Sequence, residues 1–156
     1  MTEEYLAVIP LVERLYRHFL NVVKLELDSS DIRDTSNVQA MILFNIDDAE
    51  MTVGELMLRG CYLGSNVSYN LKKMVENGYV EQAQSPHDRR SIHVKLTPKG
   101  HALRDRLAEM HRRHAVELQQ VITAAELRQV AVALGRLEGF WVRVGDKVRP
   151  FGRLTA

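Results

Sequence analysis

The sequence predicts a mainly helical protein of the α+β class, with one small β-hairpin between two groups of helices. Near both ends of the chain, apolar residues recur every three or four positions, which is the period of one helix face. Over residues 92–96 apolar and polar residues alternate, which is the period of a strand. The length of 156 residues, with 46% hydrophobic and 26% charged residues, favours one folded domain over a disordered chain.

The first helix is predicted over residues 5–27. A proline at position 10 is tolerated if the regular helix begins there, because Pro10 lacks a backbone N–H group. Residues 28–36 are polar and typical of a loop. Ser36 followed by Gln39 is the pattern of a capping box, in which two side chains satisfy free backbone N–H groups at the start of a helix. The first helix carries one apolar stripe of Tyr5, Ile9, Val12, Tyr16, Phe19 and Val23.

Two further helices and a hairpin are predicted in the middle of the chain. Thr52 and Glu55 form a second capping box, which opens a short helix through about Arg59. After a turn with a glycine at each end, Ser65 is expected to cap a helix that runs to residue 77. Gly78 then takes the left-handed position that follows a helix end. Strands are predicted at 79–84 and 92–96, joined by a charged tip.

Two long helices complete the chain. Thr97 and Pro98 predict the start of the first, and Thr123 with Glu126 is a third capping box that opens the second. The last helix carries apolar residues with the spacing of a coiled-coil seam over three heptads, and such a seam needs a partner helix. We therefore expect residues 1–30 and 98–150 to form a dimerisation region, although burial of the seam within one monomer is the alternative. The predicted dimer residues are Tyr5, Ile9, Val12, Leu127, Val130, Leu134, Leu137, Trp141 and Val144, with Val148 continuing the seam.

The order of helices and hairpin over residues 36–97 is that of a winged helix-turn-helix lobe. On the second of its helices Val67, Leu71 and Met74 share one face, and the opposite face is small and polar. Such side chains can bond to base edges, and lysines suit phosphates. The alternative is a plain amphipathic helix with a solvated face. The predicted DNA-contacting residues of this helix are Ser65, Asn66, Ser68, Tyr69, Asn70, Lys72 and Lys73.

The tip of the hairpin forms the predicted wing. An arginine there can enter a narrow A·T-rich minor groove, where negative potential is concentrated. A local ion pair of Asp88 with one of the arginines is the alternative, and the two roles are compatible. The predicted wing residues are His87, Asp88, Arg89 and Arg90.

Charge is unevenly distributed along the chain. Residues 1–58 carry 4 basic and 11 acidic side chains, for a net charge of −7. Residues 59–106 carry 9 basic and 4 acidic, net +5, and residues 107–156 carry 8 basic and 5 acidic, net +3. The total of +1 therefore hides a basic middle segment, which coincides with the predicted DNA-binding elements.

These residues resemble the MarR family of winged-helix transcription regulators. The resemblance is most specific in Asp88-Arg89-Arg90-Ser91 followed by Leu96-Thr97-Pro98-Lys99-Gly100, and it extends over nearly the whole chain. Residues 59–73 are similar to the LdtR-type subgroup. The resemblance implies a homodimer with interlocked terminal helices, with Arg90 in the minor groove and Asp88 orienting it. It also implies an effector pocket between the dimer helices and the DNA-binding lobe.

The function that we expect is a cytoplasmic, sequence-specific regulator of transcription, a repressor of palindromic double-stranded operators that a small-molecule effector releases. A winged-helix module that binds only proteins is the alternative, and the basic wing argues against it. An enzyme is not expected, because the sequence has no Gly-rich phosphate loop, nucleophile elbow or metal-ligand set. No cofactor, metal or membrane span is predicted, since the longest apolar run is about seven residues and a span needs about 20.

Three residue types suggest other chemistry and are discounted. Cys61 is either an oxidation sensor or, more in keeping with free cysteines, a small core residue. His111 and His114 could share a metal ion, but a helix face in the dimer region is the better interpretation. His18 could titrate in a pocket, and it also suits an ordinary surface position.

Overall fold

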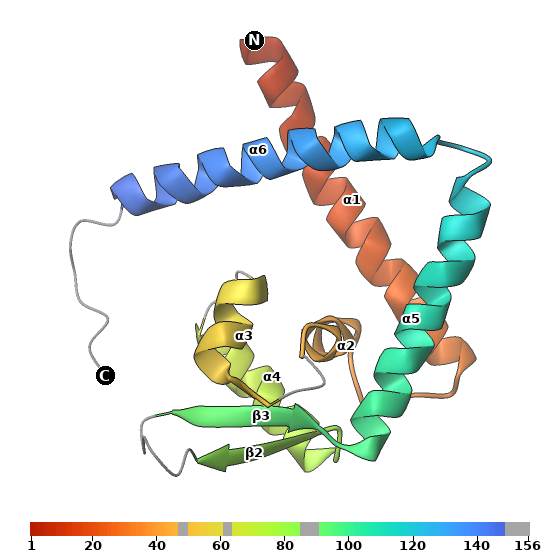
Figure 1. Ribbon diagram of the computed structural model, residues 1–156, viewed down its shortest axis with the longest axis vertical. Coiled ribbons are helices and arrows are strands. Elements are labelled where there is room, and N and C mark those ends of the chain that lie inside the picture. The colour runs from red at the N-terminus through yellow and green to blue at the C-terminus, as the bar shows by residue number, and fades with distance from the viewer. Residues whose placement is uncertain (47–49, 61–63, 85–90, 149–156) are drawn as a thin grey trace. The chain divides into compact units, whose positions relative to one another are not determined.

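The computed structural model describes residues 1–46, 50–60, 64–84 and 91–148 (Figure 1). They form a mainly helical protein with one small antiparallel sheet, which confirms the predicted fold class. The chain divides into two compact units, Met1–His111 and Arg112–Ala156. The elements in chain order are α1 (Thr2–Ser29), α2 (Asn37–Phe44), β1 (Met51–Thr52), α3 (Val53–Gly60), α4 (Gly64–Glu76), β2 (Val80–Gln84), β3 (Ile92–Leu96), α5 (Pro98–Leu118) and α6 (Ala124–Val148).

The sheet has the strand order β1-β3-β2, and both pairs of strands are antiparallel. In the predicted hairpin Val80 lies opposite Leu96, and Gln84 lies opposite Ile92. The third strand, β1, was not predicted, because two residues are too short to show an alternating pattern. Met51 of β1 lies opposite Val94, so β3 is the central strand and is held on both edges.

Helix α1 is longer than predicted and contains Pro10 in its interior. The expectation that the regular helix begins at this proline is wrong, because eight residues before it, from Thr2, are already helical. A proline inside a helix removes one backbone hydrogen bond. The helix tolerates this loss in a long element whose other turns are intact.

All three predicted capping boxes are present. Ser36 Oγ accepts from the backbone N of Gln39 at 3.2 Å, while Gln39 Oε1 accepts from the backbone N of Ser36 at 3.0 Å. Thr52 and Glu55 make the same exchange at 3.1 and 2.7 Å, and so do the residues at 123 and 126. Local sequence alone therefore places the starts of α2, α3 and α6.

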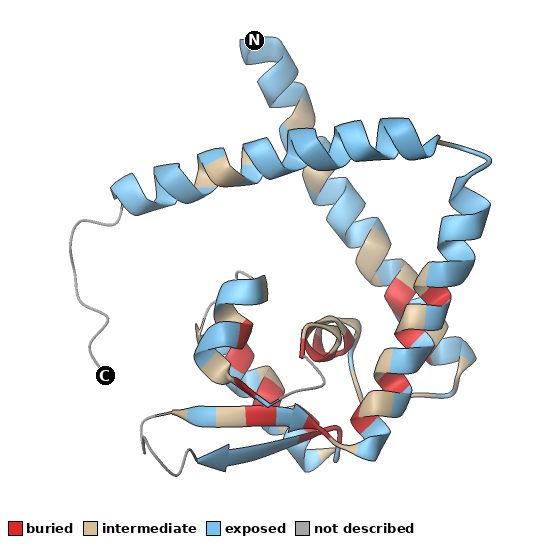
Figure 2. Ribbon diagram, viewed as in Figure 1, coloured by how far each residue is buried: buried red, intermediate tan, exposed pale blue. Residues whose placement is uncertain are grey.

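The core of the first unit lies where α1, α2, α3, α4, the sheet and the first turns of α5 meet. Figure 2 shows its buried residues on these elements, and they include the three apolar residues that the sequence places on the inner face of α4. Val67, Leu71 and Met74 are exposed by 1% or less. The apolar side of α4 is therefore fixed by packing.

The second unit contains the last residues of α5 and all of α6, and most of α6 is exposed in the single chain (Figure 2). Leu127, Val130 and Leu134 of the predicted seam are 43–45% exposed, while Leu137 and Trp141 are half-buried. These side chains share one face of a helix, as the spacing predicts.

The junction between α4, β2 and α5 is built around the backbone of Tyr79. The backbone N of Tyr79 donates to the carbonyl oxygen of Met74 at 2.8 Å, and Gly78 has the positive φ of 74° that this helix ending needs. The carbonyl oxygen of Tyr79 accepts from the backbone N of Thr97 at 3.1 Å. The first turn of α5 lies so close that a Cβ at Gly100 would overlap the carbonyl oxygen of Tyr79. Only glycine fits at position 100.

We therefore expect Gly100→Ala to destabilise the protein by about 3 kcal/mol, because backbone rather than a flexible side chain occupies the space. Thermal or urea unfolding followed by circular dichroism would measure the loss. Gly135→Ala on α6 is the control, since a Cβ there meets nothing within 4 Å. The control should be neutral or stabilising by up to about 1 kcal/mol. Equal stability of the two variants would contradict this account of the junction.

Candidate nucleic-acid interface

The polar face of α4 is exposed on the surface of the first unit. Its five central side chains from the predicted set, Ser65, Asn66, Ser68, Tyr69 and Lys72, are all exposed, and Tyr69 is 63% exposed. Hydroxyl and amide groups can both donate to and accept from base edges. The structure thus brings these side chains together on one outward surface. Ser65 does not cap the helix as predicted, because α4 already begins at Gly64.

Two members of the predicted set are engaged within α4 itself. Asn70 is half-buried, and its Nδ2 donates to the carbonyl oxygen of Asn66 at 2.8 Å. Lys73 Nζ bonds to Glu76 Oε2 at 2.8 Å, and this hydrogen bond raises the pKa of Lys73. Lys72 is exposed, so its charge can meet a phosphate more readily than that of Lys73.

An ion pair joins the two strands of the hairpin beside α4, among the residues that the structure describes. Lys95 Nζ lies 3.1 Å from Glu81 Oε2 on the neighbouring strand. The predicted wing residues His87, Asp88, Arg89 and Arg90 lie outside the described residues, as does Cys61. Their roles stay predictions.

A polar network joins the loop before α2 to the exit of α4 and the start of α5. The hydroxyl of Tyr79 donates to Asp34 Oδ1 at 2.5 Å, and Lys99 Nζ donates to Asp34 Oδ2 at 2.6 Å. Lys99 Nζ also bonds to the carbonyl oxygen of Asn77 at 2.8 Å and lies 4.2 Å from the centre of the Tyr79 ring. The Asn77 side chain in turn donates to the backbone carbonyl of Asp34. The end of α4 is therefore held by two other segments, the loop before α2 and the start of α5.

The electrostatics of this network favour a charged carboxylate beside a neutral phenol. Burial opposes ionisation of Asp34, but hydrogen bonds from Lys99 and Tyr79, together with the charge of Lys99, hold the pKa of Asp34 below its ordinary value of 3.8. Burial, and then the hydrogen bond to Asp34, raise the pKa of Tyr79 above its ordinary value. Both partners keep the form that the hydrogen bond requires at neutral pH.

The histidines singled out by the sequence lie on helix faces. His111 stacks on Phe19 with ring centres 5.8 Å apart, and it meets the edge of Phe44 at 5.1 Å. His18 is exposed on α1. Across the described ranges, no group of three or more His, Cys, Asp or Glu side chains is placed to hold a metal ion. Among the same residues, no helix has the length and apolarity needed to span a membrane.

Comparisons with known proteins show which proteins the segment that carries this surface resembles. A protein-family model described as a winged helix DNA-binding domain matches residues 36–100. Over these residues the chain is similar to that domain. The matched range covers the capped helix α2, the α3–α4 pair, the hairpin and the first turn of α5. It closely follows the lobe predicted at 36–97.

Solved structures of low sequence identity share the fold over most of the chain. FabT from Streptococcus pneumoniae, in complex with DNA, matches with a TM-score of 0.73 and 20% identity, covering 90% of this chain and 99% of that one. A MarR mutant from E. coli, complexed with operator DNA, matches with a TM-score of 0.71 and 24% identity, covering 84% and 95%. The family match and the shared fold confirm the fold that the sequence resemblance implies.

Two curated relatives match parts of the chain. The exopolysaccharide II synthesis transcriptional activator ExpG of Rhizobium meliloti is 38% identical over 99 residues, which are 64% of this chain and 51% of ExpG. The HTH-type regulator YkoM of Bacillus subtilis is 35% identical over 49 residues, 31% of this chain and 32% of YkoM. The chain thus spans about half the length of ExpG and about a third of YkoM. These matches are to a DNA-binding domain and to transcription regulators, in agreement with the prediction that the protein is not an enzyme.

Sequence reasoning missed the Asp34 network. Asp34 and Lys99 are 65 residues apart, so no local spacing connects them. The polar loop at 28–36 was recognised only as a loop. The glycine at position 100 could have suggested that another segment packs closely on the start of α5, but the sequence does not show which segment.

The structure predicts different effects for the two lysines of α4. Lys72→Ala should reduce the slope of log K against log salt for duplex DNA by about 0.9 per protomer, which is one phosphate contact. Lys73→Ala should reduce it less, because Glu76 already offsets that charge. Titrations of a fluorescent duplex at four salt concentrations would measure both slopes. An unchanged slope for Lys72→Ala would contradict the predicted phosphate contact from α4.

The network also predicts a pH dependence of stability. Because the pKa of Asp34 is lower in the folded chain, its contribution is fully present above about pH 4 and is lost as the pH falls through the folded value. Asp34→Asn should cost about 1 kcal/mol at pH 7, and the gap to the parent protein should close as the solution is acidified. Melting temperatures between pH 3 and pH 7 would test this. Asp105→Asn, at an exposed position of α5, should stay within about 0.5 kcal/mol of the parent; a gap for Asp34→Asn that is constant with pH would contradict the ionic role.

Proposed function

We propose that this protein is a sequence-specific transcription regulator that binds double-stranded DNA through the polar face of α4. The observation that carries the proposal is the outward display of Ser65, Asn66, Ser68, Tyr69 and Lys72 on a helix whose other face is locked into the core. A helix so held can enter a major groove with its small polar residues at base edges. FabT and the MarR mutant, each solved in complex with DNA, support the same use of this fold.

The wing would add the second set of contacts. Arg90, with Asp88 orienting it and Arg89 and His87 beside it, would reach the adjacent minor groove from the hairpin tip. The strands β2 and β3 supply a base for such a tip, since their register pairs all five residues of each strand. Minor-groove arginines favour narrow A·T-rich segments.

The protein would act as a homodimer on a palindromic operator. The seam of Leu127, Val130, Leu134, Leu137, Trp141 and Val144 on α6 supports this, as do Tyr5 and Ile9 of α1, which are each 38% exposed, and the half-buried Val12. A two-fold dimer would place two α4 helices about 34 Å apart, the spacing of successive major grooves on one side of a duplex.

The regulator would repress by excluding polymerase from overlapping sites in the cytoplasm, and a small effector would release it. Release requires that the effector bind more tightly to a dimer whose recognition helices are misplaced. ExpG is named an activator, so the sign of regulation must be read directly. Higher reporter output from the bound promoter without the protein supports repression, and lower output overturns it.

The test of the proposal is recovery of genomic DNA fragments by the purified protein at two salt concentrations, followed by sequencing. We expect an inverted repeat in the recovered fragments. Leu134→Arg, on the seam, should sediment as a monomer and recover no repeat, because a charge would replace an apolar contact. Val132→Arg is the matched control: Val132 is 64% exposed and lies off the seam, so this variant should stay dimeric. Absence of enrichment by the parent protein at both salt concentrations would overturn the function, and a dimeric Leu134→Arg would overturn the seam.

A further inference from the structure

Tyr69 is the one aromatic residue of α4, and it lies near the middle of the polar face of this helix. Its neighbours on that face are Ser65, about one turn before it, and Lys72, about one turn after it. The other outward residues are small or charged, whereas Tyr69 carries a large apolar ring and is 63% exposed. The ring contributes little to the packing of the first unit, because the opposite side of α4 faces the core.

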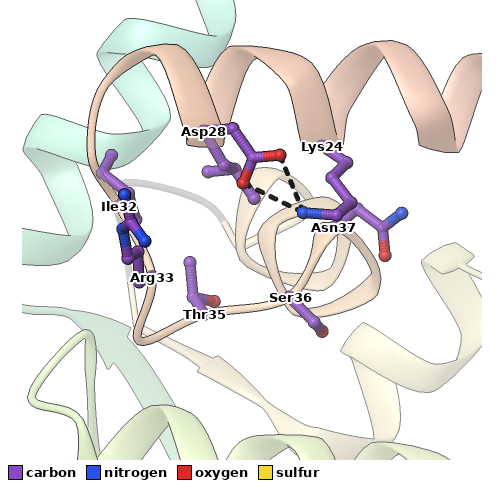
Figure 3. Close-up of a pocket in the computed structure, with 8 residues that line it drawn as sticks. Lys24, Asp28, Ile32, Arg33, Thr35, Ser36 and Asn37 are labelled. Atoms are coloured by element: carbon purple, nitrogen blue, oxygen red, sulfur yellow. Dashed lines mark hydrogen bonds and ion pairs between the residues drawn. The ribbon is translucent and has the colours of Figure 1, made fainter.

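Some exposed polar side chains of this unit are engaged with one another, as they are beside the cavity between α1 and the loop before α2 (Figure 3). There Lys24 Nζ bonds to both carboxylate oxygens of Asp28, at 2.9 and 2.8 Å. Arg33 Nε bonds to Asp31 Oδ1 at 2.8 Å. By contrast, the hydroxyl of Tyr69 has no hydrogen bond to any residue that the structure describes. Both its ring and its hydroxyl are therefore available to a partner.

The backbone that carries Tyr69 is fixed by packing on both sides. Val67 and Leu71, two residues before and two residues after it, are exposed by 1% or less. The start of α4 lies close to α3, since a Cβ at Gly64 would be 3.2 Å from Met57 Cε. A tyrosine side chain has only two χ angles, so it makes a large contact at a small cost in conformational entropy. Tyr69 can therefore present its ring to a partner at a defined place.

The major groove of B-DNA presents one apolar group among its hydrogen-bonding base edges, the C5-methyl group of thymine. Ser65 and Asn66 can bond to the polar edges, but neither side chain can make a large apolar contact. The ring of Tyr69 can, and such a contact removes both the ring and the methyl group from water. A tyrosine hydroxyl also suits a phosphate oxygen, which is the competing use of this side chain. The base edge is favoured, because Tyr69 lies in the N-terminal half of α4, the half of a recognition helix that contacts bases.

We propose that Tyr69 is a specificity-determining residue whose ring contacts the C5-methyl group of a thymine in each half of the operator. The inference rests on the proposed function, since it gives a chemical partner to one residue of the polar face of α4. It requires a T·A pair at one fixed position in each half-site, and the two positions are related by the symmetry of the dimer. The transfer free energy of one buried methyl group corresponds to about a fourfold change in affinity per half-site.

The test begins with selection of duplexes from a random-sequence DNA library by the purified full-length protein. The selected consensus is then synthesised with thymine throughout, or with deoxyuridine at one symmetric pair of positions, which removes only the C5-methyl groups. Titration of these fluorescent duplexes gives the ratio of the two affinities at each pair of positions. We expect one pair at which deoxyuridine weakens binding by about 16-fold, which is about fourfold for each half-site.

Three variants assign the methyl contact to Tyr69. Tyr69→Ala should bind the thymine and deoxyuridine duplexes equally, because the ring that contacts the methyl group is gone. Tyr69→Phe should keep the ratio of the parent protein, because the ring remains. Val75→Ala is the matched control, since it shortens another exposed apolar side chain of α4 that is not among the predicted DNA contacts. It should keep both the affinity and the ratio of the parent.

The other outcomes overturn the proposal and separate it from the proposed function. If the parent binds every thymine and deoxyuridine duplex equally, no methyl group is read, while DNA binding itself stands. An unchanged ratio in Tyr69→Ala assigns the methyl contact to another side chain. A Tyr69→Phe protein that loses the ratio, as Tyr69→Ala should, shows that the hydroxyl rather than the ring is required. If the library yields no consensus, the proposed function fails and this inference fails with it.

Discussion

The position of the candidate recognition helix depends on one residue, Tyr79. Its backbone N closes the end of α4, its carbonyl oxygen receives the start of α5, and its hydroxyl reaches the loop before α2. The ring itself is buried, since the residue is 2% exposed. Three segments of the chain thus contact the side chain or the peptide groups of Tyr79. The glycine at position 100 is the condition for this arrangement, because any side chain there would push α5 away from the Tyr79 carbonyl.

Formal charge is also divided unevenly along the chain. The net charge of +5 on residues 59–106 falls on the segment that carries α4 and the hairpin, and the −7 on residues 1–58 falls on the segment that packs behind it. A near-neutral protein can therefore carry a basic segment suited to DNA, because its excess of acidic residues lies in residues 1–58. Some of the positive charge is already offset within the fold, as at Lys73 with Glu76 and Lys95 with Glu81. Binding to DNA would then depend on a few exposed cations and respond steeply to salt.

Most of the fold could be predicted because its signals are local. Capping boxes, a proline after a threonine and a change of period each lie within a few residues, and they predicted the starts of α2, α3, α5 and α6 and the two strands of the hairpin. The failures have a common cause. Strand β1 has two residues and no period, and Pro10 breaks a local rule inside a long helix. The contacts of Asp34 with Tyr79 and Lys99 join side chains 45 and 65 residues apart, which local patterns cannot show. For the candidate site, the outward face of α4 follows from a helical wheel, whereas the engagement of Asn70 and Lys73 depends on rotamers.

The strengths of these contacts explain why a small ligand could shift such a helix. The inner face of α4 is held by Val67, Leu71 and Met74, and burying each such side chain contributes about 1.5–3 kcal/mol. That face will not detach. At the exit of α4, by contrast, the Asp34 and Lys99 side chains are 46% and 48% exposed, and their polar contacts contribute only about 1 kcal/mol each. A coupling of about 1–3 kcal/mol is the usual size between allosteric sites. The energy needed to break the Asp34 contacts at the exit of α4 therefore falls within reach of one ligand, while the energy needed to unpack its core face does not.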